Sequence, residues 1–89
     1  MISHTTEQFR RLYAQLPVQV REQARDAYRL FRNDPQHPSL RFRQVHPTRP
    51  IYSARINLNY RAVGIRDHEI MIWFWIGGHD EYERLIARL

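Results

Sequence analysis

The segment from Ile70 to Gly78, IMIWFWIGG, constrains the fold most, because it is the longest apolar run in the chain. Branched and aromatic residues favour strands, and a run without polar alternation is typical of a strand covered on both faces. The run is too short to cross a bilayer as a helix. We therefore expect residues 69–76 to form a central strand of a sheet, which Gly77-Gly78 ends.

Three shorter segments that precede this run alternate polar and apolar residues with a period of two, as half-buried strands do. They span residues 40–46, 51–58 and 60–66. In the middle one, Tyr52, Ala54, Ile56 and Leu58 share one face, and Ser53, Arg55 and Asn57 share the other. The short connections between the later strands, at Asn57-Leu58-Asn59 and Asp67-His68, indicate an antiparallel meander.

Helical spacing marks both ends of the chain. Apolar residues recur every three or four positions between Phe9 and Leu16 and again over residues 18–32, with Pro17 between the two segments. Thr5 or Thr6 is the expected cap of the first helix, and Gln8 would complete a capping box from Thr5. A last helix is expected over residues 79–89. The prediction is one α+β domain, residues 1–89, with two N-terminal helices packed on a mostly antiparallel four-stranded sheet and a short C-terminal helix.

Charge indicates the class of partner. The net charge is +5, and all 14 basic residues are arginines, whose planar guanidinium binds phosphate and carboxylate groups. An acidic partner is therefore expected, either a nucleic acid or an acidic protein. Cysteine is absent, which excludes disulfides and thiolate metal sites and suits a cytoplasmic protein. We expect no signal peptide, because the first residues show no basic stretch followed by an apolar run, and no membrane partner. We expect no metal, because the histidines lack ligand spacing, and no cofactor.

An arginine-rich sheet face is the first candidate site. Consecutive strands would place Arg55 and Arg61 near each other across one hairpin, and Arg41 and Arg43 could extend the patch from the first strand. Phosphate binding is the natural use of such a surface. The alternative is a half-exposed face on which arginine stems cover apolar atoms.

His79 is the second candidate, because it follows a strand that delivers it to the rim of the sheet. A histidine there can act as a general acid or base near neutral pH, although it could also be a solvent-exposed residue at a helix start. Tyr82, one turn later, could point in the same direction or fill the core. His46, at the end of the first strand, is a weaker candidate base.

Three motifs together resemble one protein family: HPSLRF at residues 37–42, YRA at residues 60–62 and WIGGHDEY at residues 75–82. The arrangement resembles the RelE/ParE superfamily of toxins from type II toxin–antitoxin systems, over nearly the whole chain. The resemblance implies a cytoplasmic toxin that a small cognate antitoxin neutralises. Members such as RelE, YoeB and YafQ cleave mRNA on the ribosome, by attack of a 2′-hydroxyl on the adjacent phosphate.

Residue by residue, the resemblance implies that Arg61 contacts the scissile phosphate and that Arg55 assists it. His79 would donate a proton, and Tyr82 lies near a tyrosine used by other members. The chain departs from RelE in having no lysine. The glutamate base of YoeB-like members has no clear counterpart before Arg61. The function predicted is a ribosome-dependent mRNA endoribonuclease. The alternatives are a ParE-like toxin, which inhibits DNA gyrase without nuclease activity, and an inactive relative.

Overall fold

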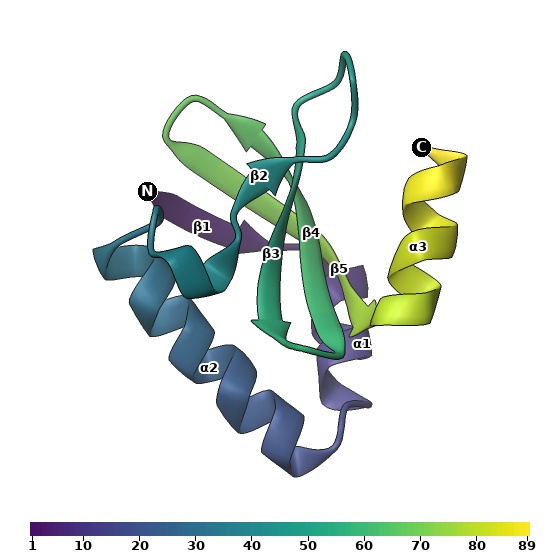
Figure 1. Cartoon of the computed structure of the whole chain (residues 1–89). Helices are drawn as coiled ribbons and strands as arrows, with labels where there is room; N and C mark the ends of the chain where they lie inside the picture. Colours follow the sequence, from purple (N-terminus) through teal and green to yellow (C-terminus); the bar gives the residue numbers. More distant parts are fainter.

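A single twisted sheet organises the protein. In the computed structural model, which describes residues 1–89, five strands lie in the order β1-β5-β4-β3-β2 (Figure 1). Their bounds are β1 Ile2–Thr5, β2 Arg43–Gln44, β3 Ile51–Asn57, β4 Tyr60–Asp67 and β5 Ile70–Gly78. Strands β2 to β5 pair antiparallel, whereas β1 runs parallel to β5. The α+β class and the mostly antiparallel meander predicted from the sequence are confirmed.

Helices cover the sheet on both faces, as Figure 1 shows. Helices α1 (Glu7–Ala14) and α2 (Val18–Asn33) pack on one face, against a core that includes Ala54, Ala62 and Trp73. Helix α3 (His79–Arg88) packs on the other face, where Tyr82 joins Ile51 and Val63. The small residues Ala54 and Ala62 on adjacent strands leave space for the large side chains of the helices.

The first strand was not predicted. Residues 2–5 pair with β5 from Ile70 to Trp73, and Ser3 accepts a hydrogen bond from the indole nitrogen of Trp73 at 3.2 Å. Four mostly polar residues carry little strand signal by themselves, and β5 supplies the order as a template. The sheet therefore has five strands rather than four. The apolar β5 is an interior strand paired on both edges, with β1 and β4, and β4 is the middle strand.

The first predicted helix and the first predicted strand also differ at their ends. Thr6 caps α1 by accepting from the Phe9 amide, while Thr5 belongs to β1 and Gln8 donates to the Phe74 carbonyl instead of closing a capping box. The strand predicted over residues 40–46 is reduced to β2. A short 3₁₀ helix, η1 (Pro38–Leu40), precedes it, and Arg41 adopts a left-handed conformation with φ 44°.

The later elements lie close to their predicted positions, apart from small shifts at their ends. The second helix extends one residue beyond the prediction, to Asn33. Gly77 and Gly78 end β5 as its last two paired residues, opposite Arg61 and Tyr60 of β4, whereas the prediction ended the paired strand at Ile76. Leu58 lies in the β3–β4 turn, 73% exposed, rather than on the inner face of a strand. No helix combines the length and the apolar character that crossing a membrane requires.

Candidate functional site

A basic hollow lies beside the start of α3, on the sheet face opposite α1 and α2. Its volume is about 320 Å³, and residues from the η1–β2 segment, β3, β4 and α3 line it. The lining residues are Arg41, Arg43, Ser53, Arg55, Arg61, His79, Tyr82 and Glu83. Six of the residues predicted from the sequence, all except the weaker candidate His46, therefore surround one space, although they come from four separate segments. We refer to Arg41, Arg43, Arg55 and Arg61 as the arginine cluster.

Strand pairing brings the cluster together. Arg55 and Arg61 are direct partners across the β3–β4 hairpin, and Arg61 is also the partner of Gly77 in β5. Arg43 is the partner of Ser53 in β3, which places it two positions along from Arg55 on the same face. The left-handed backbone at Arg41 is uncommon for a residue with a side chain and costs free energy. The chain turns there so that Arg41 reaches the hollow.

Arg61 is the most constrained member of the arginine cluster. Its Nη1 donates to the carbonyls of Asn57 at 2.7 Å, Tyr60 at 3.1 Å and Leu58 at 3.4 Å. Partial burial lowers the pKa of the Arg61 guanidinium, and the positive charge of Arg55 beside it lowers this pKa further. An anion in the hollow would relieve this like-charge repulsion, so the cluster suits a phosphate group.

His79 is the first residue of α3, and its side chain is 44% exposed. The main-chain amide of His79 donates to the Asn59 carbonyl at 2.7 Å, which ties the helix start to the β3–β4 turn. The imidazole Nε2 lies 3.4 Å from Oε1 of Glu83, one helical turn later. An accessible imidazole beside a guanidinium cluster can exchange a proton with a bound phosphodiester.

Tyr82 is buried and takes part in the second core. Only 6% of it is exposed, and its hydroxyl donates to Oγ of Ser53 at 3.1 Å. Its ring lies 6.0 Å from the His79 ring, centroid to centroid. The hydroxyl is thus held at the base of the hollow by another buried side chain. This matches the core alternative considered for Tyr82 in the sequence.

His46 lies outside the hollow and is engaged elsewhere. Its Nδ1 accepts from the amides of Thr48 and Arg49, and its Nε2 lies 3.1 Å from the Leu89 carbonyl oxygen. Nδ1 therefore closes the β2–β3 loop on itself, and Nε2 holds this loop against the C-terminus. This geometry argues against His46 as a base for chemistry at the arginine cluster.

Two residues of the hollow, Ser53 and Glu83, were missed in the sequence. Both had a usable signal. Ser53 shares a strand face with Arg55, and Glu83 follows His79 by four residues, the spacing that puts two side chains on one face of a helix. Neither signal stood out, because serines and glutamates with these spacings are common on ordinary surfaces.

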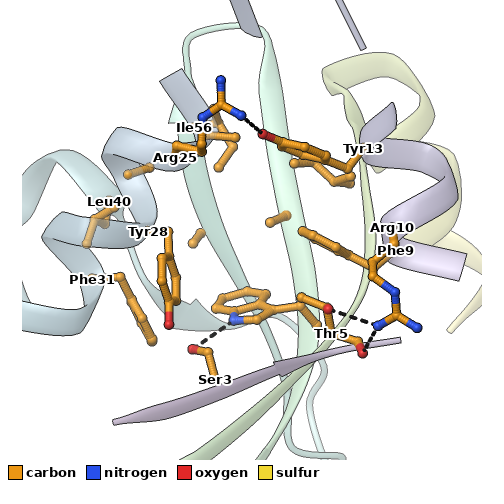
Figure 2. Close-up of a pocket in the computed structure, with 16 residues that line it drawn as sticks. Ser3, Thr5, Phe9, Arg10, Tyr13, Arg25, Tyr28, Phe31, Leu40 and Ile56 are labelled. Atoms are coloured by element: carbon orange, nitrogen blue, oxygen red, sulfur yellow. Dashed lines mark hydrogen bonds between the residues drawn. The ribbon is translucent and has the colours of Figure 1, made fainter. Parts of the chain in front are cut away.

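A second hollow is apolar and lies on the opposite side of the sheet. Figure 2 shows it between the side chains of α1 and α2, with Tyr13 and Phe9 on one side and Tyr28 and Phe31 on the other. Its volume is about 390 Å³. Arg25 donates to the Tyr13 hydroxyl at 3.1 Å, which links the two helices across the space. Its titratable lining residues are arginines and tyrosines, with no histidine and no carboxylate, so acid–base chemistry near neutral pH is assigned to the basic hollow.

Comparison with known structures identifies the fold. A chain of the RelB–RelE antitoxin–toxin complex from Methanococcus jannaschii superposes with a TM-score of 0.72 at 12% identity, covering 91% of this chain and 95% of that chain. YafQ from Escherichia coli strain BL21(DE3) gives 0.70 at 10% identity, covering 90% and 94%. The YoeB/ParE toxin from Agrobacterium tumefaciens gives 0.68 at 15% identity, covering 89% and 99%.

Comparison of sequences identifies the family. No curated protein matches the chain. The family model of the ParE-like toxin domain matches residues 18–84, from the start of α2 into α3, and so includes the whole basic hollow. This match spans well over half of the chain, and the superpositions agree with it in fold. The protein belongs to the ParE-like toxin domain family of the RelE/ParE toxin superfamily.

Proposed function

We propose that this toxin is an endoribonuclease that cleaves mRNA on the ribosome. The observation that carries the proposal is the convergence of His79 and the arginine cluster on one open hollow. Had His79 packed into the core, or had Arg61 faced the other side of the sheet, the two could not serve one phosphate. The hollow instead combines an accessible imidazole with several guanidinium groups, as phosphodiester cleavage requires.

The proposed reaction follows from this arrangement. The 2′-oxygen of a nucleotide bonds to the adjacent phosphorus while the bond from phosphorus to the 5′-oxygen breaks. The attacking hydroxyl loses its proton to solvent, and His79 supplies a proton to the departing 5′-oxygen. Arg61 and Arg55 stabilise the negative charge that grows on the phosphoryl oxygens. The products are a 2′,3′-cyclic phosphate and a free 5′-hydroxyl.

A cognate antitoxin is the proposed protein partner. RelB accompanies RelE in the M. jannaschii, Pyrococcus horikoshii and E. coli complexes that resemble this chain. A net charge of +5 favours an acidic partner here as well. Coverage of the basic hollow, or replacement of α3 on the sheet, would each block access to His79.

The test is inducible expression of the wild type, His79→Ala and Arg55→Ala in cells without antitoxin, with mapping of transcript 5′ ends. We expect the wild type to arrest growth and to produce cuts in phase with the reading frame. We expect His79→Ala to lower cleavage about 100-fold or more, as loss of a general acid does. Intact transcripts during growth arrest by the wild type would refute the nuclease proposal.

Inhibition of DNA gyrase is the second candidate, because the matching family model is that of the ParE-like toxins. It makes the opposite prediction for His79, since a protein that acts by binding needs no proton donor. Growth arrest that persists in His79→Ala, together with loss of supercoiling by purified gyrase, would favour it. Growth that continues in the presence of the wild-type protein would favour the inactive relative.

A further inference from the structure

Glu83 is the one carboxylate among the residues that line the basic hollow. Its Oε1 lies 3.4 Å from Nε2 of His79, and the two side chains are 62% and 44% exposed. The spacing of four residues within α3 maintains this contact without help from the rest of the fold. A carboxylate so placed among guanidinium groups needs a physical explanation, because it weakens the attraction of the hollow for phosphate.

In the proposed reaction, Glu83 could act either as the base for the 2′-hydroxyl or as a partner of His79, and the geometry distinguishes these two roles. Displacement at phosphorus places the attacking and departing oxygens on opposite sides of the phosphorus atom. A base and an acid that serve these two oxygens must therefore stand apart, across the phosphate. Glu83 touches His79 directly, so the two act on the same side. Glu83 is therefore a partner of His79 and not a separate base for the 2′-hydroxyl.

The contact has a definite chemical effect on the imidazole. A neutral imidazole carries its proton on one of two nitrogens, and the group beside one nitrogen decides which. The other charged and titratable groups around the hollow are the arginine cluster, which donates only, and the Tyr82 hydroxyl, which is bound to Ser53. Glu83 is the acceptor that the structure places beside the ring, with its Oε1 3.4 Å from Nε2.

We infer that Glu83 is a positioning residue, which holds the proton of His79 on Nε2 and so leaves Nδ1 as the nitrogen that exchanges protons with the substrate. This inference rests on the proposed nuclease function for its purpose, although the contact itself does not. It also explains the acidic residue in a basic site. The carboxylate keeps the His79 ring oriented with Nε2 toward Glu83, while the arginines hold the phosphate.

The first experiment needs no RNA. The purified chain, made by cell-free synthesis with ¹⁵N-labelled histidine, is studied by NMR at about pH 9, well above the reference pKa of imidazole. We expect the wild-type His79 ring to show the Nε2–H tautomer. In Glu83→Ala we expect a mixture of both tautomers. Glu81→Ala is the matched control, because Glu81 is an exposed residue of the same helix outside the hollow.

The second experiment measures ribosome-dependent cleavage of one mRNA. We expect Glu83→Ala to lower kcat about tenfold, which is less than loss of the acid itself, while KM does not rise because a negative charge leaves the hollow. Glu83→Gln should recover most of the rate, because its amide oxygen still accepts the Nε2 proton. We expect both Glu83 variants to unfold at the temperature of the wild type. A role in stability alone would not lower the rate in Glu83→Ala and restore it in Glu83→Gln at an unchanged unfolding temperature.

The outcomes separate the two proposals. An unchanged His79 tautomer in Glu83→Ala overturns the inference about Glu83, whatever the activity. A tautomer change with a wild-type protein that cleaves no RNA confirms the contact and refutes the nuclease function. A rate in Glu83→Ala equal to that of the wild type overturns the role in catalysis.

Discussion

At the scale of single residues, Arg61 has two roles. One guanidinium nitrogen closes the β3–β4 turn through three carbonyl oxygens, and the rest of the group faces the basic hollow. The family resemblance implied only the second role, contact with phosphate in the hollow. Loss of activity in Arg61→Ala is therefore ambiguous, because the substitution removes turn contacts as well as charge. Arg55, whose side chain makes no hydrogen bond in the structure, is the cleaner probe of phosphate binding.

This difference makes the first prediction. Arg61→Ala should lower the free energy of unfolding by about 1–3 kcal/mol, because three backbone carbonyls lose a charged donor. Arg55→Ala should leave stability nearly unchanged, or raise it slightly by removing a like charge beside Arg61. Urea unfolding followed by fluorescence measures both. Equal midpoints for the two variants would contradict the structural role of Arg61.

The pair of Tyr82 and Ser53 carries the second prediction. Tyr82→Phe should cost about 1 kcal/mol, because the Ser53 hydroxyl is left buried without its donor. Ser53→Ala should cost a similar amount, and the double variant should cost less than the sum of the two, which a double-mutant cycle would measure. If Tyr82→Phe instead keeps full stability but abolishes RNA cleavage, the tyrosine is catalytic and not structural.

At the scale of elements, an irregularity in the β4–β5 pairing places α3 beside the arginine cluster. Val63 is the partner of Trp75, but the next residue, Gly64, is the partner of Trp73, so β5 contains one extra residue. From there the register continues to Gly77 opposite Arg61, and α3 begins two residues later. The strand periodicity of the sequence does not reveal such a bulge, because both strands are apolar at this point.

Gly64 is the residue that permits this close approach, which is the third prediction. A Cβ atom there would lie 2.7 Å from the Ile72 carbonyl oxygen, whereas a Cβ at Gly78 would meet nothing closer than 3.8 Å. Gly64→Ala should therefore lower stability by about 1–3 kcal/mol, as overpacking does. Gly78→Ala is the matched control. Thermal unfolding measures both variants, and equal midpoints would contradict the role given to Gly64.

At the scale of the whole molecule, positive charge is concentrated where the fold opens. The sequence carries a net charge of +5, but only the tertiary structure brings four of the arginines to one hollow of about 320 Å³. Other arginines are paired on the surface, as Arg11 is with Glu7 at 3.2 Å and Arg29 with Asp26 at 2.7 Å. Such exposed pairs contribute little to stability, and they lie on α1 and α2, away from the hollow.

This distribution gives the fourth prediction, on salt dependence. If the arginine cluster neutralises four phosphates of a single-stranded RNA, log Kobs should fall against log salt with a slope of about −3. Arg43→Ala should reduce the slope by about 0.7, since one contact is lost. Arg11→Ala removes the same charge from α1 and should leave the slope unchanged. Equal slopes for the two variants in a fluorescence titration would show that the hollow is not the binding surface.

The sequence by itself determined the fold class, the three helices and three of the five strands, because period and apolar runs report burial locally. It also placed Arg55 and Arg61 on one strand face, since alternation and a short turn suffice for a hairpin. The tertiary structure alone decided β1, whose order comes from β5, and the extent of β2, where Arg41 departs from strand geometry. It alone decided that His79 and Glu83 stand beside the arginine cluster, because that meeting depends on strand pairing and helix packing between segments far apart in the chain.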